Sequence, residues 1–478
     1  MKVLFIFPIP SAKYIFVDFQ NGIASISAIL KQKQHETSLW VSDALNTSEI
    51  TRKIEKFQPG LVGCSYTSDQ SVLAEKMINF IYDQFHLPII AGGPHPTVCP
   101  EETIRIRGVK FLCVGEGEYP MLELVKALEK NEDYRHIQNL WIDEGKEIIK
   151  NEVRPLIRDL DSLPFPDRDL FDYQKLLDID HRADFMAGRG CPYPCSYCIN
   201  HKVMELYRGK GKYVRLRKVK NVIEEIQQVL SKYQRVESIH FHDDTFIINK
   251  TWVNEFCKEY KKHINMPLLI NARADLIDEE VIESLKRAGC IEIKIGVEHG
   301  NEYIRNSIMK RNMSNEQIIN AFQIIKKTGI KTWAYNMMGL PEETKSTIWD
   351  TINLNREIKP DKLFISIFYP YKGTTLYEYC KEKGMLTDQT VNTYFEPIST
   401  LQLPTIKKKE VEYYFRIFRI AVMYPKMLWF GQILAKAKIW KNMTLYDGAY
   451  ILLYRSFIFI RKNFPPVLKE KIFKILRI

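Results

Sequence analysis

This chain of 478 residues lacks several patterns, and each absence excludes a class of protein. No apolar run reaches about 18 residues, so no membrane-spanning helix is expected. The opening run, MKVLFIFPIP, has no small-residue cleavage site behind it, and we interpret it as a first β-strand rather than a signal peptide. No G-x-G-x-x-G follows that strand, which disfavours a dinucleotide site. With 45% hydrophobic and 27% charged residues, the composition is that of a globular protein with a sizeable core.

Paired cysteines are also lacking. Six of the nine cysteines are scattered along the chain, so a disulfide framework is not expected. A reducing, cytoplasmic location fits this cysteine usage best. The other three cysteines, Cys191, Cys195 and Cys198, form one tight group.

Short apolar runs alternate with helical patterns in residues 1–140, the predicted first domain. The runs lie at residues 2–7, 37–42, 61–66, 87–93 and 110–115, and the first helical pattern covers residues 22–34. This alternation predicts a doubly wound, Rossmann-like parallel sheet covered by helices on both faces. Ligands of such sheets bind at the carboxyl ends of the strands. Residues 141–182, rich in Pro, Asp and Arg, are predicted to form an extended interdomain linker.

A second alternation, of about six βα units, fills residues 183–397. Candidate strands lie at residues 184–190, 238–246, 268–275, 292–299, 331–340 and 362–370. They predict a partial (β/α)6 barrel with its active site at the carboxyl ends of the strands. Polar residues gather at those ends: Cys191, Asp243, Asp244, Arg273, Asp275, Glu298 and Asn336. Residues 398–478 are predicted to form a helical, basic and aromatic extension.

The cysteine group has the composition of a metal-binding loop. Residues 188–198, Gly-Arg-Gly-Cys-Pro-Tyr-Pro-Cys-Ser-Tyr-Cys, follow a predicted strand, and their glycines and prolines exclude regular secondary structure. A four-iron cluster held by three thiolates keeps one iron open for an exchangeable ligand. Zinc is the main alternative, but a structural zinc site needs four ligands, and no second C-x-x-C or H-x-x-x-H follows downstream.

The spacing C-x-x-x-C-x-x-C, with Tyr197 before the last cysteine, resembles the signature of the radical S-adenosylmethionine superfamily. The resemblance extends over about residues 1–400 and is to the cobalamin-dependent branch, which includes class B methylases and anaerobic Mg-protoporphyrin monomethyl ester cyclases. It implies a [4Fe-4S] cluster on Cys191, Cys195 and Cys198, with S-adenosylmethionine on the open iron. Reductive cleavage would then give a 5′-deoxyadenosyl radical that abstracts a substrate hydrogen. A flavodoxin or ferredoxin-type protein is the implied electron donor.

The same resemblance implies a binding site for S-adenosylmethionine at the neighbouring strand ends. Asp243 and Asp244 resemble the F-x-D-D-x-F element of the branch and occupy the place where the methionine amino group binds. Arg273 is a candidate for the methionine carboxylate. Glu298 matches the I-G-x-E-x-G motif, and Gly339 resembles the glycine beside the adenine. Taken alone, each charged residue could equally form an ion pair on a barrel rim.

The first domain is similar to the cobalamin-binding domain of this branch. The D-x-H-x-x-G motif, which supplies a lower axial His in mutase-type domains, is absent, but many branch members bind cobalamin without it. We interpret His95 as a turn histidine with local hydrogen bonds rather than a cobalt ligand. The predicted contacts of the nucleotide loop and the corrin are Ser65, Thr67, Gly92, Gly93, Pro94, Gly115, Glu116 and Gly117.

The resemblance implies methyl transfer to an unactivated carbon, or to a phosphinate phosphorus, of a small-molecule substrate. Cyclisation, rearrangement and anaerobic hydroxylation share the same motifs and stay open. A tRNA methylthiotransferase fits less well, because that class has additional N-terminal cluster cysteines and a C-terminal RNA-binding β-barrel. A non-catalytic cobalamin sensor would have little need for the charged set at the barrel mouth.

The net charge of +11 is concentrated at the C-terminus, where residues 401–478 contain 16 Lys and Arg against four Asp and Glu. One interpretation is a helical cap on the barrel with a solvated basic face. The other is an amphipathic helix on anionic lipid, which would place the protein peripherally at the inner membrane face and suggest a lipid or other hydrophobic substrate. Nucleic acid is not expected, because the basic residues alternate with bulky aliphatic ones.

Overall fold

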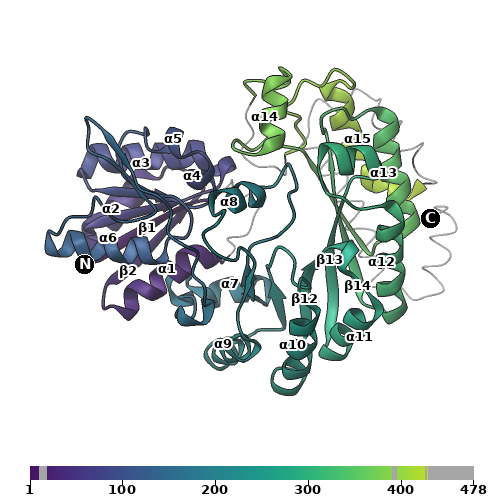
Figure 1. Cartoon of the computed structure of the whole chain (residues 1–478), viewed down its shortest axis with the longest axis horizontal. Coiled ribbons are helices and arrows are strands. Elements are labelled where there is room, and N and C mark those ends of the chain that lie inside the picture. The colour runs from purple at the N-terminus through teal and green to yellow at the C-terminus, as the bar shows by residue number, and fades with distance from the viewer. Residues whose placement is uncertain (10–18, 390–395, 426–427, 429–478) are drawn as a thin grey trace.

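A computed structural model describes residues 1–9, 19–389, 396–425 and 428 of the chain. Two sheets organise these residues. The first sheet lies in the N-terminal domain, drawn in purple and blue in Figure 1, and the second in the barrel domain, drawn in teal and green.

The N-terminal sheet has the strand order β2-β1-β3-β4-β5-β6-β7. The first five strands are parallel: β1 (Lys2–Pro8), β2 (Glu36–Ser42), β3 (Leu61–Ser65), β4 (Ile89–Gly92) and β5 (Val109–Cys113). The order 2-1-3-4-5 reverses between β1 and β3, and such a switch point is where open α/β sheets bind ligands. The antiparallel strands β6 (Leu140–Asp143) and β7 (Ile148–Lys150) extend the sheet ten residues beyond the predicted boundary at residue 140.

Alternate residues of β1 point into two separate cores, one on each face of the sheet. Helices therefore cover both faces. Val3 and Phe5 belong to the core that includes residues of α1 (Asn21–Gln32) and α6 (Glu118–Lys130). Leu4 and Ile6 belong to the other core, beneath α2 (Thr47–Phe57) and α3 (Ser71–Phe85). The prediction of a doubly wound sheet is confirmed. The short helices α4 (Pro94–Val98) and α5 (Pro100–Thr103) follow β4.

The linker is more structured than its composition suggested. It contains two short 3-10 turns, Leu160–Ser162 and Arg168–Phe171, and the helix α7 (Tyr173–Asp180). Arg168 anchors it to the barrel domain, because its guanidinium lies 2.6 Å from Glu225 and both side chains are buried. The linker is therefore part of the packed structure.

The barrel sheet has six parallel strands in the order β15-β14-β13-β12-β11-β8, as predicted for a partial (β/α)6 barrel. The strands are β8 (Arg182–Phe185), β11 (Ser238–Phe241), β12 (Leu268–Ala272), β13 (Cys290–Glu298), β14 (Lys331–Met338) and β15 (Lys362–Ile367). The helices between them are α9 (Val219–Lys232), α10 (Lys250–His263), α11 (Glu279–Ala288), α12 (Asn315–Thr328) and α13 (Lys345–Ile358). A two-stranded ribbon, β9 (Gly188–Arg189) with β10 (Arg215–Leu216), and α8 (Asn200–Leu206) lie between β8 and α9.

Two helices, α14 (Thr375–Glu382) and α15 (Lys408–Met423), follow the last strand. Helix α15 packs on α13, where Arg356 donates to the Ala421 carbonyl at 2.9 Å. As far as Met423, the C-terminal region is thus a helical cap on the barrel. No helix among the described residues is long and apolar enough to span a membrane. Residues 429–478, which carry most of the predicted lipid-binding segment, lie outside the described part of the chain.

Candidate functional site

The three clustered cysteines lie in the loop between β9 and α8, at the carboxyl ends of the barrel strands. Cys195 is buried, and Cys191 and Cys198 are half-buried. Asn200 donates to the Cys198 sulfur from its backbone nitrogen at 3.5 Å and from its side-chain amide at 3.6 Å. Arg273 Nη1 lies 3.8 Å from the Cys195 sulfur. These donors are of the kind that stabilise thiolate sulfur in an iron–sulfur site.

The spacing of the sulfurs differs from that around a single zinc ion. Four thiolate ligands of one zinc stand about 3.8 Å apart, given Zn–S bonds of about 2.3 Å. Within the described ranges, the only group of three or more His, Cys, Asp or Glu residues with ligand atoms within 4.8 Å of one another does not include these cysteines. In this structure the three sulfurs are therefore not drawn together as the ligands of one zinc ion would be.

Burial raises the pKa of the Cys198 thiol to about 12 and also raises the pKa of Cys191. Because only thiolates ligate iron, the cysteines need the positive charge of the bound cluster to ionise.

The two acidic residues after β11 lie beside this loop. The Asp243 carboxylate accepts from the Ala187 backbone nitrogen at 2.9 Å, and burial raises the pKa of Asp243 to about 7. The Asp244 carboxylate accepts from the Asn200 amide at 3.1 Å, so Asn200 connects it to Cys198. Both carboxylates thus lie where a cationic amino group near the cluster would meet them.

Arg273 is committed to other side chains. Its Nε and Nη2 donate to the two carboxylate oxygens of Asp275 at 3.0 and 3.1 Å, and its guanidinium lies 3.5 Å from the centre of the Tyr193 ring. Nη2 also donates to the Arg311 carbonyl at 3.0 Å. In this conformation Arg273 holds the cysteine loop against β12, and a ligand carboxylate would have to displace one of these partners.

Arg311 is a site residue that sequence reasoning missed. It donates to the Tyr197 hydroxyl at 2.8 Å and to the Gly296 carbonyl at 2.6 Å, and it lies 3.5 Å from the Glu298 carboxylate. Its Nε is buried and has no hydrogen-bond partner among the described residues. Burial raises the pKa of Glu298, while the Arg311 charge opposes that rise. Arg311 lies in a loop after β13 rather than at a strand end, so no strand pattern pointed to it.

The two remaining predicted barrel residues, Gly339 and Asn336, lie in different places. Gly339 lies at the end of a strand, and Asn336 faces the helices. Gly339 follows β14 with a φ of +79°, which favours glycine, and its nitrogen donates to the buried Glu343 carboxylate at 2.5 Å. Asn336, in contrast, accepts from the Asn355 amide of α13 at 2.7 Å. It faces the helix layer, and the expectation that it lies with the polar residues of the site was wrong.

A cavity of about 350 Å³ opens where the N-terminal strand ends meet the linker and the barrel. Phe5 and Met121 line its apolar part, and Met186 and Arg189 of the barrel domain close it from the other side. Six of the eight predicted cobalamin contacts line it: Ser65, Gly92, Gly93, Gly115, Glu116 and Gly117. Thr67 and Pro94 do not line it.

The glycine-rich edge fits a bulky cofactor, because backbone and small side chains leave the space above the strand ends open. Gly93 and Gly115 have φ values of +95° and +88°, which favour glycine. His95 lies below this edge, where its Nδ1 is 2.9 Å from the Ser68 hydroxyl. That contact supports the interpretation of His95 as a locally bonded turn histidine.

Glu116 joins the two domains. Its carboxylate lies 2.9 Å from Arg215 and 3.0 Å from Arg189, and it accepts from the Ile157 backbone nitrogen at 2.9 Å. Together with the neighbouring pair of Glu118 and Arg189 at 2.5 Å, these ion pairs fix the wall of the cavity. They leave Glu116 little freedom to bind a ligand as well.

Replacing Gly115 with Ala is expected to destabilise the protein and lower its cobalamin content. An added Cβ would lie 1.9 Å from the Tyr207 hydroxyl, which is buried and accepts from the Glu116 nitrogen at 2.8 Å. We expect about 1–3 kcal/mol for this overlap, in addition to about 1–2 kcal/mol for the positive φ. Gly209→Ala is the matched control, since Gly209 has a φ of +77° and open space around it. Equal melting temperatures of the two variants would contradict this role of Gly115.

Comparisons with known proteins agree with this geometry. The radical SAM superfamily model matches residues 186–354, and the B12 binding domain model matches residues 17–125. An uncharacterized methyltransferase of Pyrococcus horikoshii is 28% identical, over 83% of this chain and 87% of the relative. The anaerobic magnesium-protoporphyrin IX monomethyl ester cyclase of Rubrivivax gelatinosus is 26% identical, over 79% of this chain and 69% of the relative.

Solved structures share the fold. TsrM of Kitasatospora setae, a radical S-adenosylmethionine methyltransferase solved with cobalamin and a [4Fe-4S] cluster, has a TM-score of 0.65 at 17% identity. The alignment covers 80% of this chain and 78% of TsrM. OxsB, a cobalamin-dependent S-adenosylmethionine radical enzyme, has a TM-score of 0.68 at 15% identity and covers 100% of this chain and 75% of its own.

Each domain model coincides with one half of the site, the B12 model with the glycine-rich edge and the radical SAM model with the cysteine loop. The chain therefore contains a B12 binding domain and a radical SAM domain, and its cofactors are a [4Fe-4S] cluster, S-adenosylmethionine and cobalamin.

Proposed function

We propose that the protein is a methyltransferase that places a methyl group on an unactivated carbon of a small hydrophobic molecule. The observation that carries the proposal is the cavity shared by the two domains, which is lined both by the glycine-rich strand ends and by Met186, Gly188 and Arg189 next to the cysteine loop. A methyl donor on the first domain and a radical generator on the second would face each other across it. The Pyrococcus relative, named as a methyltransferase, supports the same reaction class.

The cofactors, when bound, supply a 5′-deoxyadenosyl radical from S-adenosylmethionine and a transferable methyl group from cobalamin. The chain holds and orients them. Cys191, Cys195 and Cys198 ligate three irons and leave the fourth iron open. Asp243 and Asp244 lie beside the loop to accept the methionine ammonium group.

The remaining part of the proposed S-adenosylmethionine site is assigned by charge and position. The group of Arg311, Glu298 and Tyr197 offers one cation, one carboxylate and one hydroxyl to the methionine carboxylate and the ribose. Arg273 stays in the set as the residue that positions the cysteine loop. Gly339, at the end of β14, stays the candidate for the position beside the adenine.

The barrel interior supports a hydrophobic or aromatic acceptor. Ala334 and Asn336 of β14 face the helices. Trp333 and Tyr335 alternate with them along the strand and therefore face the barrel interior. Their rings stack at 5.7 Å, and Phe364 of β15 lies 5.2 Å from Tyr335. This aromatic wall suits an apolar molecule better than a highly charged one.

Cyclisation is the second candidate function, favoured by the similarity to the Rubrivivax cyclase over 79% of this chain. The two reactions consume S-adenosylmethionine differently. Methyl transfer uses one molecule as methyl source and one as radical source, whereas cyclisation uses the radical alone.

The products of S-adenosylmethionine decide between them. With reconstituted protein, cobalamin, a reductant and an acceptor, methyl transfer is expected to give S-adenosylhomocysteine and 5′-deoxyadenosine in equal amounts. Deuterated methyl-labelled S-adenosylmethionine should then pass its label to the product, as measured by mass spectrometry. Deoxyadenosine with an unlabelled product would favour cyclisation, and no deoxyadenosine at all would overturn both candidates.

A further inference from the structure

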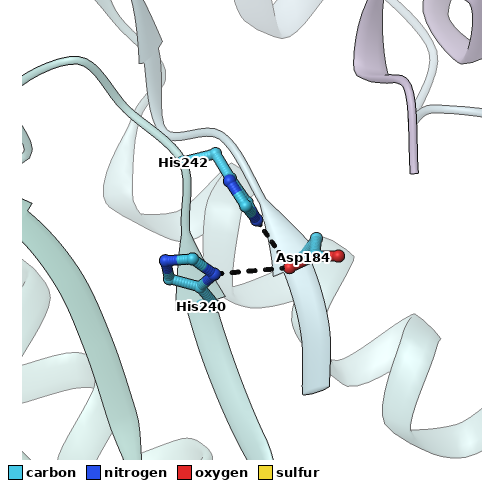
Figure 2. Close-up of side chains that lie close together, drawn as sticks. All are labelled: Asp184, His240 and His242. Atoms are coloured by element: carbon cyan, nitrogen blue, oxygen red, sulfur yellow. Dashed lines mark hydrogen bonds and ion pairs between the residues drawn. The ribbon is translucent and has the colours of Figure 1, made fainter. Parts of the chain in front are cut away.

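Three ligating side chains meet inside the barrel, away from the cysteine loop. Asp184 lies on β8, and His240 and His242 belong to β11 and the residue after it. The two strands are parallel neighbours, and Asp184 and His240 are register partners. Because successive side chains of a strand alternate between its faces, His240 and His242 share one face, while Phe241 faces the helices. Figure 2 shows both imidazoles turned toward the Asp184 carboxylate.

In the metal-free protein the three ligand atoms lie close together, and the shortest contact between them is a hydrogen bond that a bound ion would replace. One oxygen of Asp184 lies 2.6 Å from His242 Nε2 and 3.5 Å from His240 Nδ1. The two ring centres are 4.0 Å apart. In the described part of the chain, this is the one group of three or more potential ligands whose ligating atoms all lie within 4.8 Å of one another.

The surrounding residues fix these ligands before any ion binds. The Asp184 backbone is held from the linker, where the Tyr173 hydroxyl accepts from its nitrogen at 2.9 Å and Arg168 donates to its carbonyl at 2.9 Å. Lys294 of β13 lies 3.0 Å from His240 Nε2, so in the metal-free protein its ammonium group donates to that nitrogen and Nδ1 holds the ring proton. A metal ion on Nδ1 would displace this proton, and Nε2 would take a proton from Lys294, whose neutral amine would then accept from the ring. Preset ligands of this kind lose less entropy on binding than flexible surface residues.

The group is also accessible. His240 is buried, but the His242 side chain is 38% exposed, so an ion can reach the site from solvent. Two imidazoles and one carboxylate make a donor set that suits Zn²⁺ and related first-row divalent ions, and Mg²⁺ and Ca²⁺ prefer oxygen ligands alone.

We propose that Asp184, His240 and His242 bind one first-row divalent metal ion of the Zn²⁺ type, separate from the iron–sulfur cluster. Three protein ligands leave at least one coordination position for water or for an oxygen atom of another molecule. The proposal does not depend on which reaction the protein catalyses, because it rests on the ligand geometry alone.

The test uses the full chain after anaerobic reconstitution, so that the cluster occupies the cysteines. Zinc sulfate is added, the excess is removed by desalting, and zinc per chain is measured by mass spectrometry. We expect one zinc per chain. Zinc-edge X-ray absorption is expected to show nitrogen and oxygen ligands at about 2.0–2.1 Å and no sulfur at about 2.3 Å. A sulfur shell would place the zinc on the cysteine loop and overturn the proposal.

His242→Gln is the decisive variant, because its exposed side chain can change without disturbing the core. We expect its zinc affinity to fall at least about tenfold. Asp184→Asn should have the same effect. The matched control is His263→Gln on α10, where His263 pairs with Glu259 at 3.3 Å and, among the described residues, is not in any group of three ligands. Wild-type protein that retains no zinc, or a His242→Gln variant that retains zinc like the wild type, would refute the site.

Discussion

Replacing Cys195 with Ala is expected to abolish 5′-deoxyadenosine formation while cobalamin binding stays intact. Cys195 is the most buried of the three loop cysteines, and its sulfur lies 3.8 Å from Arg273. Without this thiolate only two ligands remain, which do not retain a four-iron cluster with a single open iron. The glycine-rich edge belongs to the N-terminal domain, and none of the three loop cysteines lines the cavity. Deoxyadenosine is measured by chromatography and cobalamin by its absorption spectrum.

Cys99→Ala controls for the general effect of losing a cysteine. Cys99 is half-buried in the N-terminal domain, between α4 and α5, and does not line the cavity. This variant is expected to keep both deoxyadenosine formation and cobalamin. If Cys195→Ala lost cobalamin together with deoxyadenosine, the two cofactor sites would not be separable by domain, and our division of the chain would be wrong.

Arg168→Met is expected to lower the stability of the protein by about 3–5 kcal/mol, the usual cost of removing one partner from a buried ion pair. Arg168 and Glu225 are 4% and 1% exposed and lie 2.6 Å apart. The guanidinium also stands over the rings of Phe19, Tyr173 and Phe185, at 4.7 to 5.4 Å from their centres. Its loss leaves Glu225 with Arg217 as its remaining ion-pair partner among the described residues. Thermal denaturation followed by circular dichroism measures the change.

An exposed ion pair of the same linker provides the control. Lys232 of α9 pairs with Asp169, and these side chains are 49% and 55% exposed. Lys232→Met should cost less than about 1 kcal/mol, because water screens the charges and the side chains lose conformational freedom on pairing. If both variants melted at the same temperature, the buried ion pair would not stabilise the protein more than the exposed one, and our expectation would be wrong.

The architecture could be predicted from the sequence because the signal is local. Apolar runs bounded by glycine or polar residues marked every parallel strand, and the first helical pattern, predicted at residues 22–34, agrees with α1 at Asn21–Gln32 within two residues at both ends. The linker was harder. Its prolines and charges indicated an extended segment, and the residues that hold the linker against the barrel, such as Glu225 for Arg168, are distant in sequence.

The sequence predicted only those parts of the candidate site whose residues lie close together in one short segment. The cysteine loop and the pair Asp243 and Asp244 are visible as short motifs. Arg311 was missed because it reaches Tyr197 from a separate loop, 114 residues further along the chain. Asn336 was wrongly expected to face the site. Successive side chains of a strand point to opposite faces, and the sequence did not show which face Asn336 occupies. The meeting of Asp184 with His240 and His242 depends on the pairing of β8 with β11, and Asp184 and His242 are 58 residues apart in the sequence.

The ion pairs of Glu116 with Arg189 and Arg215 limit how this architecture can be recombined. An N-terminal domain exchanged from a relative would need an acidic residue at the position of Glu116. Without it, Arg215 would lose its ion-pair partner among the described residues, and Arg189 would keep only Glu118. In chimeras that are meant to change substrate choice, the junction between the two parent sequences is therefore better placed after Arg215. The domain interface and the cofactor cavity then come from one parent. The barrel wall of Trp333, Tyr335 and Phe364 could then be exchanged as a unit.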